Sequence, residues 1–299
     1  MTQAMTNPTP LNTFDDIDWN QIWMARQQRS RDAGRGGGCP SAWQSKRAAL
    51  KYWQNVQDNP RTQERLNDTL SFCSAESRLL DIGAGPGTLA IPLAARVRHI
   101  TAVEPAAGMV EVLRDHIAER GIENIHIVHK TWDDIDIARD LQPPYDVTIA
   151  SYSMGMLDLR ESIRRMMAVT SGTIVIYWHI GDQPWDAEAR VLWPLLHGKE
   201  HYPIPKSDLL FQVLCQMGVY PHVTTLRTPR QQTFESFEAM LDDYAERYDV
   251  STAEQRRLLA GYLSERCQRE DGKYIIRAQH NSMKLWWAVS DVEGRAQGA

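Results

Sequence analysis

Short apolar runs alternate with amphipathic stretches through the middle of the chain, between residues 78 and 180. The runs are rich in Val, Ile and Leu, which is typical of buried strands, and the amphipathic stretches are typical of helices. Strands are expected at 78–82, 99–103, 125–129, 145–150 and 172–178, and helices at 87–95, 108–120 and 159–168. This alternation predicts an α/β fold with a mostly parallel sheet and helices on both faces.

The flanking segments depart from strict alternation and predict additions around the sheet. An N-terminal helical cap is expected at 14–72, the core at 73–180, a Pro-rich insertion with a short helix at 181–206, and the rest of the sheet at 207–291 with a helical insertion at 234–268. In these flanks, helices are expected at 15–33, 42–57, 61–72, 207–217, 234–248 and 252–268, and strands at 220–227, 273–277 and 282–289. Residues 1–13 and 292–299 are expected to be disordered tails.

Composition narrows the functional class. The chain has 299 residues and a net charge of −5, a balance that argues against a nucleic-acid partner but leaves room for a local basic patch. No apolar run is long enough to span a bilayer, and the polar N-terminus does not resemble a secretory signal. The four cysteines are far apart, which predicts reduced thiols and a cytoplasmic protein without membrane association. No cluster has metal-ligand spacing, so no metal is expected.

A glycine-rich loop follows the first core strand and carries the strongest functional signal. Its sequence from Asp81 to Gly87 is Asp-Ile-Gly-Ala-Gly-Pro-Gly, and Glu104 ends the next expected strand. A dinucleotide site would require a third glycine where Thr88 stands, and a phosphate-binding P-loop would require a Gly-Lys-Ser/Thr sequence that is absent. S-adenosylmethionine (SAM) has no phosphates, and its ammonium group and ribose hydroxyls favour acidic partners such as Asp81 and Glu104.

These motifs resemble those of the class I SAM-dependent methyltransferases, in particular the type 11/12-like members that act on small molecules. The resemblance covers roughly residues 42–180 and implies a Rossmann-like, seven-stranded, mostly parallel sheet with N-terminal helices and helical lid insertions. It also implies that SAM is the cofactor. By position, the implied cofactor-binding residues are Asp81, Gly83, Ala84, Gly85, Gly87, Glu104, Pro105, Met109, Trp132, Asp133, Ser151 and Tyr52. The aromatic cover over the cofactor falls to Tyr52 or its neighbour Trp53.

Methyl transfer from a sulfonium requires an in-line nucleophile and exclusion of water, so a strong catalytic motif is not needed. Tyr152, after the fourth strand, and His179, after the fifth, are the candidate catalytic residues, although a pocket wall and a satisfied histidine are the plainer interpretations. The sequence Ala-Ser-Tyr-Ser at 150–153 differs from the Asn/Asp-Pro-Pro-Tyr/Phe motif of many amino-group methyltransferases acting on nucleic acids or glutamine. That difference favours a small-molecule acceptor.

The acceptor is expected to contact three additions, at 14–57, 181–206 and 234–268. A basic N-terminal stretch fits a solvated helix surface, an anionic small molecule or RNA; its members are Arg26, Arg29, Arg31, Arg35, Lys46, Arg47 and Lys51. A tRNA or protein methyltransferase is the alternative enzyme, and a non-catalytic SAM-binding regulator is the alternative of another class. The sequence leaves the oligomeric state open, with a homodimer among the options.

Overall fold

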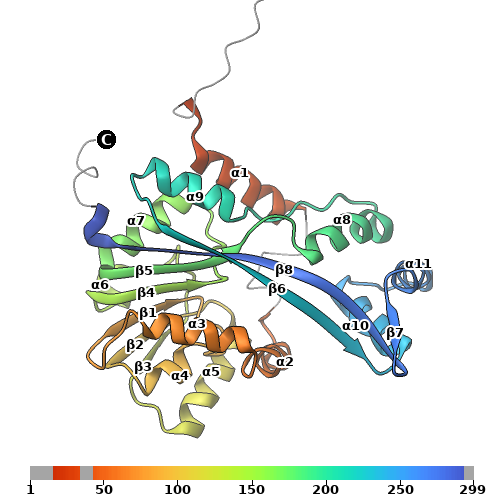
Figure 1. The fold of residues 1–299 in the computed structure, drawn as a ribbon, viewed down its shortest axis with the longest axis horizontal. Coiled ribbons are helices and arrows are strands. Elements are labelled where there is room, and N and C mark those ends of the chain that lie inside the picture. The colour runs from red at the N-terminus through yellow and green to blue at the C-terminus, as the bar shows by residue number, and fades with distance from the viewer. Residues whose placement is uncertain (1–15, 34–42, 293–299) are drawn as a thin grey trace, which may run out of the picture.

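A twisted sheet with helices on both faces forms the centre of the molecule (Figure 1). The computed structural model describes residues 16–33 and 43–292. The main path of the sheet has the order β3-β2-β1-β4-β5-β8-β6, and a short β7 pairs with β8. The strands are β1 Arg78–Ile82, β2 His99–Val103, β3 Ile125–Val128, β4 Tyr145–Ser151, β5 Thr170–His179, β6 His222–Phe234, β7 Gln268–Glu270 and β8 Lys273–Ala288. The first five are parallel, which confirms the predicted α/β fold.

Local capping stabilises several of the helices, and most of them bury one face. Asp18 caps α1, Ser45 caps α2 and Asp158 caps α7, each by accepting backbone N–H groups through its side chain. The helices are α1 Trp19–Asp32, α2 Lys46–Val56, α3 Pro60–Leu70, α4 Ala90–Ala94, α5 Ala107–Arg120, α6 Ile137–Asp140, α7 Leu159–Val169, α8 Pro184–His197, α9 Ser207–Gln216, α10 Phe237–Arg247 and α11 Ala253–Ser264. A 3-10 helix, Val289–Val292, follows β8 and includes the first residue of the tail predicted at 292–299. The rest of that tail and the predicted tail at 1–13 lie outside the described residues.

Two cores lie on opposite faces of the sheet. One joins α1, α7 and α9 to residues such as Leu80, and the other joins α3 and α4 to residues such as Leu79. Successive strand residues point to opposite faces, so neighbours in sequence enter different cores. The same alternation places Trp287 in the first core and Trp286 against the second, where its ring lies 5.0 Å from that of Phe72.

The C-terminal part differs from its prediction. The two strands expected at 273–277 and 282–289 form one strand, β8, and β6 continues to Phe234 instead of ending near residue 227. Polar residues fill the part of β6 after residue 227, so the pattern there does not indicate a strand. Pairing with β8 stabilises this part instead. The helix expected at 252–268 ends at Ser264 because β7 begins at Gln268.

The long antiparallel pair of strands β6 and β8, called the β6–β8 ribbon below, extends beyond the other strands of the sheet and carries a separate lobe (Figure 1). Helices α8, α10 and α11 pack there around a third apolar core that includes Trp193, Tyr244 and Leu259. The short helix expected in the Pro-rich insertion is α8, which is 14 residues long and contains Pro194. The predicted helical additions therefore form one lobe beside the carboxyl ends of the central strands.

Candidate cofactor and acceptor site

The glycine loop after β1 has a backbone conformation that residues other than glycine rarely adopt. Gly83, Gly85 and Gly87 have φ angles of 75°, 58° and 90°, in the left-handed region. A Cβ on Gly83 would lie 2.3 Å from Cβ of Ser153, so this turn packs directly against the segment after β4. A Cβ on Gly85 would meet nothing within 4 Å, which leaves that side of the loop open.

Two buried carboxyl groups flank this loop at the ends of neighbouring strands. Asp81 is 2% exposed and Glu104 is 6% exposed. The oxygens of Glu104 accept backbone N–H bonds from Gly85 and Ala106, both at 2.8 Å. Burial raises the pKa of Asp81 to about 7, the charge of Glu104 adds to the rise, and Arg65 opposes it. Burial also raises the pKa of Glu104 against its two hydrogen bonds. A ligand with a cationic group would stabilise the ionised form of Asp81.

The cleft beside the loop is lined by α2, α3, the loop itself and the end of β4. Its lining residues are Tyr52, Arg65, Asp81, Gly83, Ala84, Gly85, Pro86, Thr88, Leu89 and Ser151. The structure thus brings together six of the residues predicted to bind the cofactor: Tyr52, Asp81, Gly83, Ala84, Gly85 and Ser151. Glu104 adjoins this set through Gly85, and Met109 packs with Tyr52 in a small cluster between α2 and α5.

Arg65 on α3 is a cleft residue that sequence reasoning missed. Its guanidinium donates to Oγ of Ser151 at 2.6 Å and to Oγ1 of Thr62 at 3.1 Å, and it lies 5.2 Å from the ring of Tyr152. A lone arginine on an amphipathic helix is not a motif. Only the packing of α3 over the end of β4 places this cation at the cleft.

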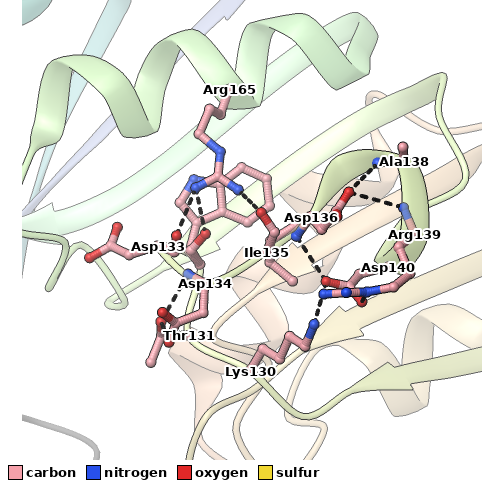
Figure 2. A network of polar contacts seen from close by, with 11 residues as sticks. Lys130, Thr131, Asp133, Asp134, Ile135, Asp136, Ala138, Arg139, Asp140 and Arg165 are labelled. Atoms are coloured by element: carbon pink, nitrogen blue, oxygen red, sulfur yellow. Dashed lines mark hydrogen bonds and ion pairs between the residues drawn. The ribbon is translucent and has the colours of Figure 1, made fainter.

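The loop after β3, predicted to flank the adenine, is held by Arg165 of α7 (Figure 2). The guanidinium donates to the carbonyl oxygens of Trp132, at 3.0 Å, Asp133, at 3.1 Å, and Ile135. The Trp132 ring is buried in the core, and its Nε1 donates to the Ser162 carbonyl at 3.3 Å. The exposed Asp133 side chain points away from this network (Figure 2), so of the two residues it is the one open to a ligand.

The candidate catalytic residues, Tyr152 and His179, lie together at the ends of β4 and β5. Their rings stack with centroids 5.0 Å apart, and the Tyr152 hydroxyl donates to Oγ of Ser282 at 3.0 Å. Nδ1 of His179 lies 3.0 Å from Nε2 of His280, a hydrogen-bonded pair. Burial, together with nearby positive charge, lowers the pKa of His179 to about 3 and that of His280 to about 4. Both rings are therefore neutral at pH 7 and hold a proton weakly.

Helix α1 fixes the segment that follows Tyr152. Nε1 of Trp23 donates to the Met156 carbonyl at 3.0 Å. The side chains of Gln27 and Arg31 both donate to the Gly155 carbonyl, at 2.7 and 2.8 Å. The N-terminal helix α1 therefore positions the loop that contains Gly155 and Met156, beside the cleft.

The basic N-terminal stretch is largely used within the chain. Lys46 pairs with Glu111 and Asp115 on α5, whereas Arg47 and Lys51 pair with acids of α10. Arg35 lies outside the described residues. Within 16–33 and 43–292 there is no group of three or more metal-ligating side chains, and no helix there is long and apolar enough to cross a membrane. The three cysteines in these ranges are not in disulfides.

Comparisons with known proteins agree with this geometry. Residues 79–171 match a family model described as a methyltransferase domain. An uncharacterised protein of Haemophilus influenzae is 26% identical over 260 residues, which is 85% of this chain and 91% of that protein. An uncharacterised methyltransferase of Bacillus subtilis, YcgJ, is 31% identical over 98 residues, covering 32% of this chain and 38% of its own length. The solved YcgJ structure shares the fold, with a TM-score of 0.50 at 16% identity, over 75% of this chain and 97% of that one.

Proposed function

We propose that this chain, which belongs to the class I SAM-dependent methyltransferases, transfers the SAM methyl group to a small-molecule acceptor by in-line displacement. The observation that supports the proposal most directly is the pair of buried carboxyl groups, Asp81 and Glu104, on either side of an open glycine loop. A cationic, phosphate-free cofactor suits these groups, and a buried carboxyl at Asp81 would disfavour a pyrophosphate beside the loop.

In the proposed complex, Asp81 accepts hydrogen bonds from the SAM ammonium and Glu104 accepts them from the ribose hydroxyls. The remaining cofactor residues follow the cleft: Gly83 to Gly87 allow close backbone approach, Met109 and Pro105 lie below the ribose, and Asp133 faces the adenine. Tyr52 covers the cofactor from α2. Arg65, already at the cleft, has the charge to pair with the carboxylate of the methionine moiety.

Tyr152 and His179 are proposed to form the wall against which the acceptor lies. A His179 ring with a pKa of about 3, and with Nδ1 bonded to His280, is a poor proton acceptor at neutral pH. Its proposed part is to orient the acceptor by hydrogen bonding. Sulfonium activation then supplies the driving force, and an acceptor that arrives deprotonated needs no strong base.

Two features support a small-molecule acceptor over tRNA or protein. The lobe of α8, α10 and α11 and the helix α2 approach each other through the Lys51–Asp243 and Arg47–Glu246 ion pairs, at 2.9 and 2.8 Å. Three members of the basic stretch, Lys46, Arg47 and Lys51, are paired with carboxylates, which reduces its attraction for RNA phosphates. We also propose a cytoplasmic location, from the unpaired cysteines.

Calorimetry with SAM tests the cofactor site. Wild type should bind, and Asp81→Ala or Glu104→Ala should weaken binding at least tenfold, because each removes a charge-assisted bond. The exposed Glu119→Ala is the matched control and should bind as wild type does. If both site variants retain wild-type affinity, the assignment is wrong.

Production of S-adenosylhomocysteine in a metabolite screen separates an enzyme from a SAM-binding regulator, and a salt-sensitive RNA-binding assay tests the tRNA alternative.

A further inference from the structure

One row of polar side chains crosses the sheet from the cofactor cleft to strand β6 at its edge. Strand register places it on a single face, because directly paired residues share a face and alternate residues repeat it. Asp81 pairs with Ile149, two residues before Ser151; Ser151 pairs with Tyr177, two before His179. The register continues the row through Ser282, His280, Thr228 and Arg230.

Aromatic rings that carry no charge gather at the middle of this row, where Tyr152 and Trp185 of α8 join the two histidines. The rings of Tyr152, His179, Trp185 and His280 lie with neighbouring centroids between 5.0 and 5.7 Å apart. All four side chains are partly exposed. Because burial and the surrounding cations lower the pKa of both histidines, the cluster carries no charge at pH 7. Such a surface fits the face of a flat, unsaturated molecule.

The far end of the row holds a guanidinium that has no direct hydrogen bond or ion pair within the described part of the chain. The Arg230 guanidinium is 5.9 Å from the ring of Trp185 and makes no hydrogen bond or ion pair with another described residue. Burial and the charge of Arg247 lower its pKa, and the charges of Glu188 and Asp243 only partly oppose that fall. Beside it, Oγ1 of Thr228 is buried and has no hydrogen-bond partner in the described part of the chain.

The carboxylates near Arg230 are already in use. Both oxygens of Glu188 accept hydroxyl groups, from Tyr244 and Tyr248, each at 3.3 Å. Asp243 pairs with Lys51 at 2.9 Å and with Arg247 at 2.6 Å. Arg230 and Thr228 therefore remain as donors without a direct acceptor in the described chain, and a single planar guanidinium beside one hydroxyl matches the two oxygens of a carboxylate.

We propose that the methyl acceptor is a flat organic carboxylate whose acid group binds Arg230 and Thr228 and whose ring system lies along Tyr152, His179, Trp185 and His280. The inference rests on the proposed function, since it assumes that the methyl group is delivered near Ser151. The end of β4 and strand β6 are separated by three strand spacings, a distance of about 14 Å. The acid group of the acceptor therefore lies far from the atom that is methylated. The acceptor is accordingly longer than a single ring.

The probe pair 4′-hydroxybiphenyl-4-carboxylate and its primary amide tests this, because the two differ in charge and little in shape. Binding is measured by calorimetry on protein saturated with S-adenosylhomocysteine. Wild type should bind the acid at least tenfold more tightly than the amide. Arg230→Gln should remove this preference, and Arg230→Lys should retain part of it. Arg227→Gln, an exposed position on the same strand, is the control and should keep the preference.

The outcomes separate the two proposals. Failure of wild type to bind S-adenosylhomocysteine contradicts the proposed function, whatever the acid does. If the cofactor product binds but the acid does not, or acid and amide bind equally, the carboxylate inference is wrong and the methyltransferase proposal stands. An acid preference that survives in Arg230→Gln also overturns it. Retained S-adenosylhomocysteine affinity in the Arg230 variants shows that they are folded.

Discussion

Replacing Asp81 by Asn should stabilise the ligand-free protein while removing SAM binding. The folded state raises the pKa of this carboxyl from 3.8 to about 7, so between these values the folded chain binds more protons than the unfolded chain. The free energy of unfolding therefore falls as pH rises through this window. At 1.36 kcal/mol per pKa unit, the free energy of unfolding falls by about 4 kcal/mol at pH 8 and about 2 kcal/mol at pH 5, relative to acid pH where the carboxyl is protonated in both states.

Urea unfolding at pH 5 and pH 8, without cofactor, measures this directly. The gain in unfolding free energy from Asp81→Asn should grow by about 2–3 kcal/mol between the two pH values. Glu123→Gln changes an exposed carboxyl and should give no comparable growth. A gain that is the same at both pH values, or a loss at pH 8, would refute the reasoning. Saturating SAM should stabilise wild type and leave Asp81→Asn unchanged, because the ammonium is what offsets the buried charge.

Two further substitutions probe the frame around the cleft. Gly83→Ala places a methyl 2.3 Å from Cβ of Ser153 at a φ of 75°, so it should cost about 2 kcal/mol or more in urea unfolding and weaken SAM binding; unchanged stability and affinity would contradict the packing described. Trp23→Phe leaves the buried Met156 carbonyl without its donor and should destabilise the protein by about 2–3 kcal/mol. Backbone amides of the loop around Met156 should then exchange hydrogen faster than in wild type. Faster exchange in distant helices alone would argue against this role of Trp23.

How much the sequence predicts depends on whether a feature is local. The glycine loop, Asp81 and Glu104 are encoded within single strand–loop units, and alternation alone assigns Trp286 and Trp287 to opposite faces, as observed. Arg65 was not predicted, because its place at the cleft depends on how α3 packs across β4.

The long β6–β8 ribbon illustrates the same limit of prediction from sequence. Residues 228–233 read as a loop because polar side chains dominate, and their strand conformation comes from pairing with β8, some 45 residues later in sequence. The row from Ser151 to Arg230 was equally hidden, since it exists only once the strand order and register are known. Pattern along the chain specifies elements, whereas chemistry shared between elements requires their pairing.

The β6–β8 ribbon also determines which contact around the cleft opens most easily when ligands enter. The lobe of α8, α10 and α11 is joined to the sheet by two continuous strands, and bending that ribbon would break ladder hydrogen bonds. Helix α2 is held to the same lobe by two ion pairs with largely solvent-exposed partners, which are weak and screened by salt. The weak contact of the enclosure is therefore the one between α2 and the lobe, and turnover should respond to ionic strength through the separation of these two parts.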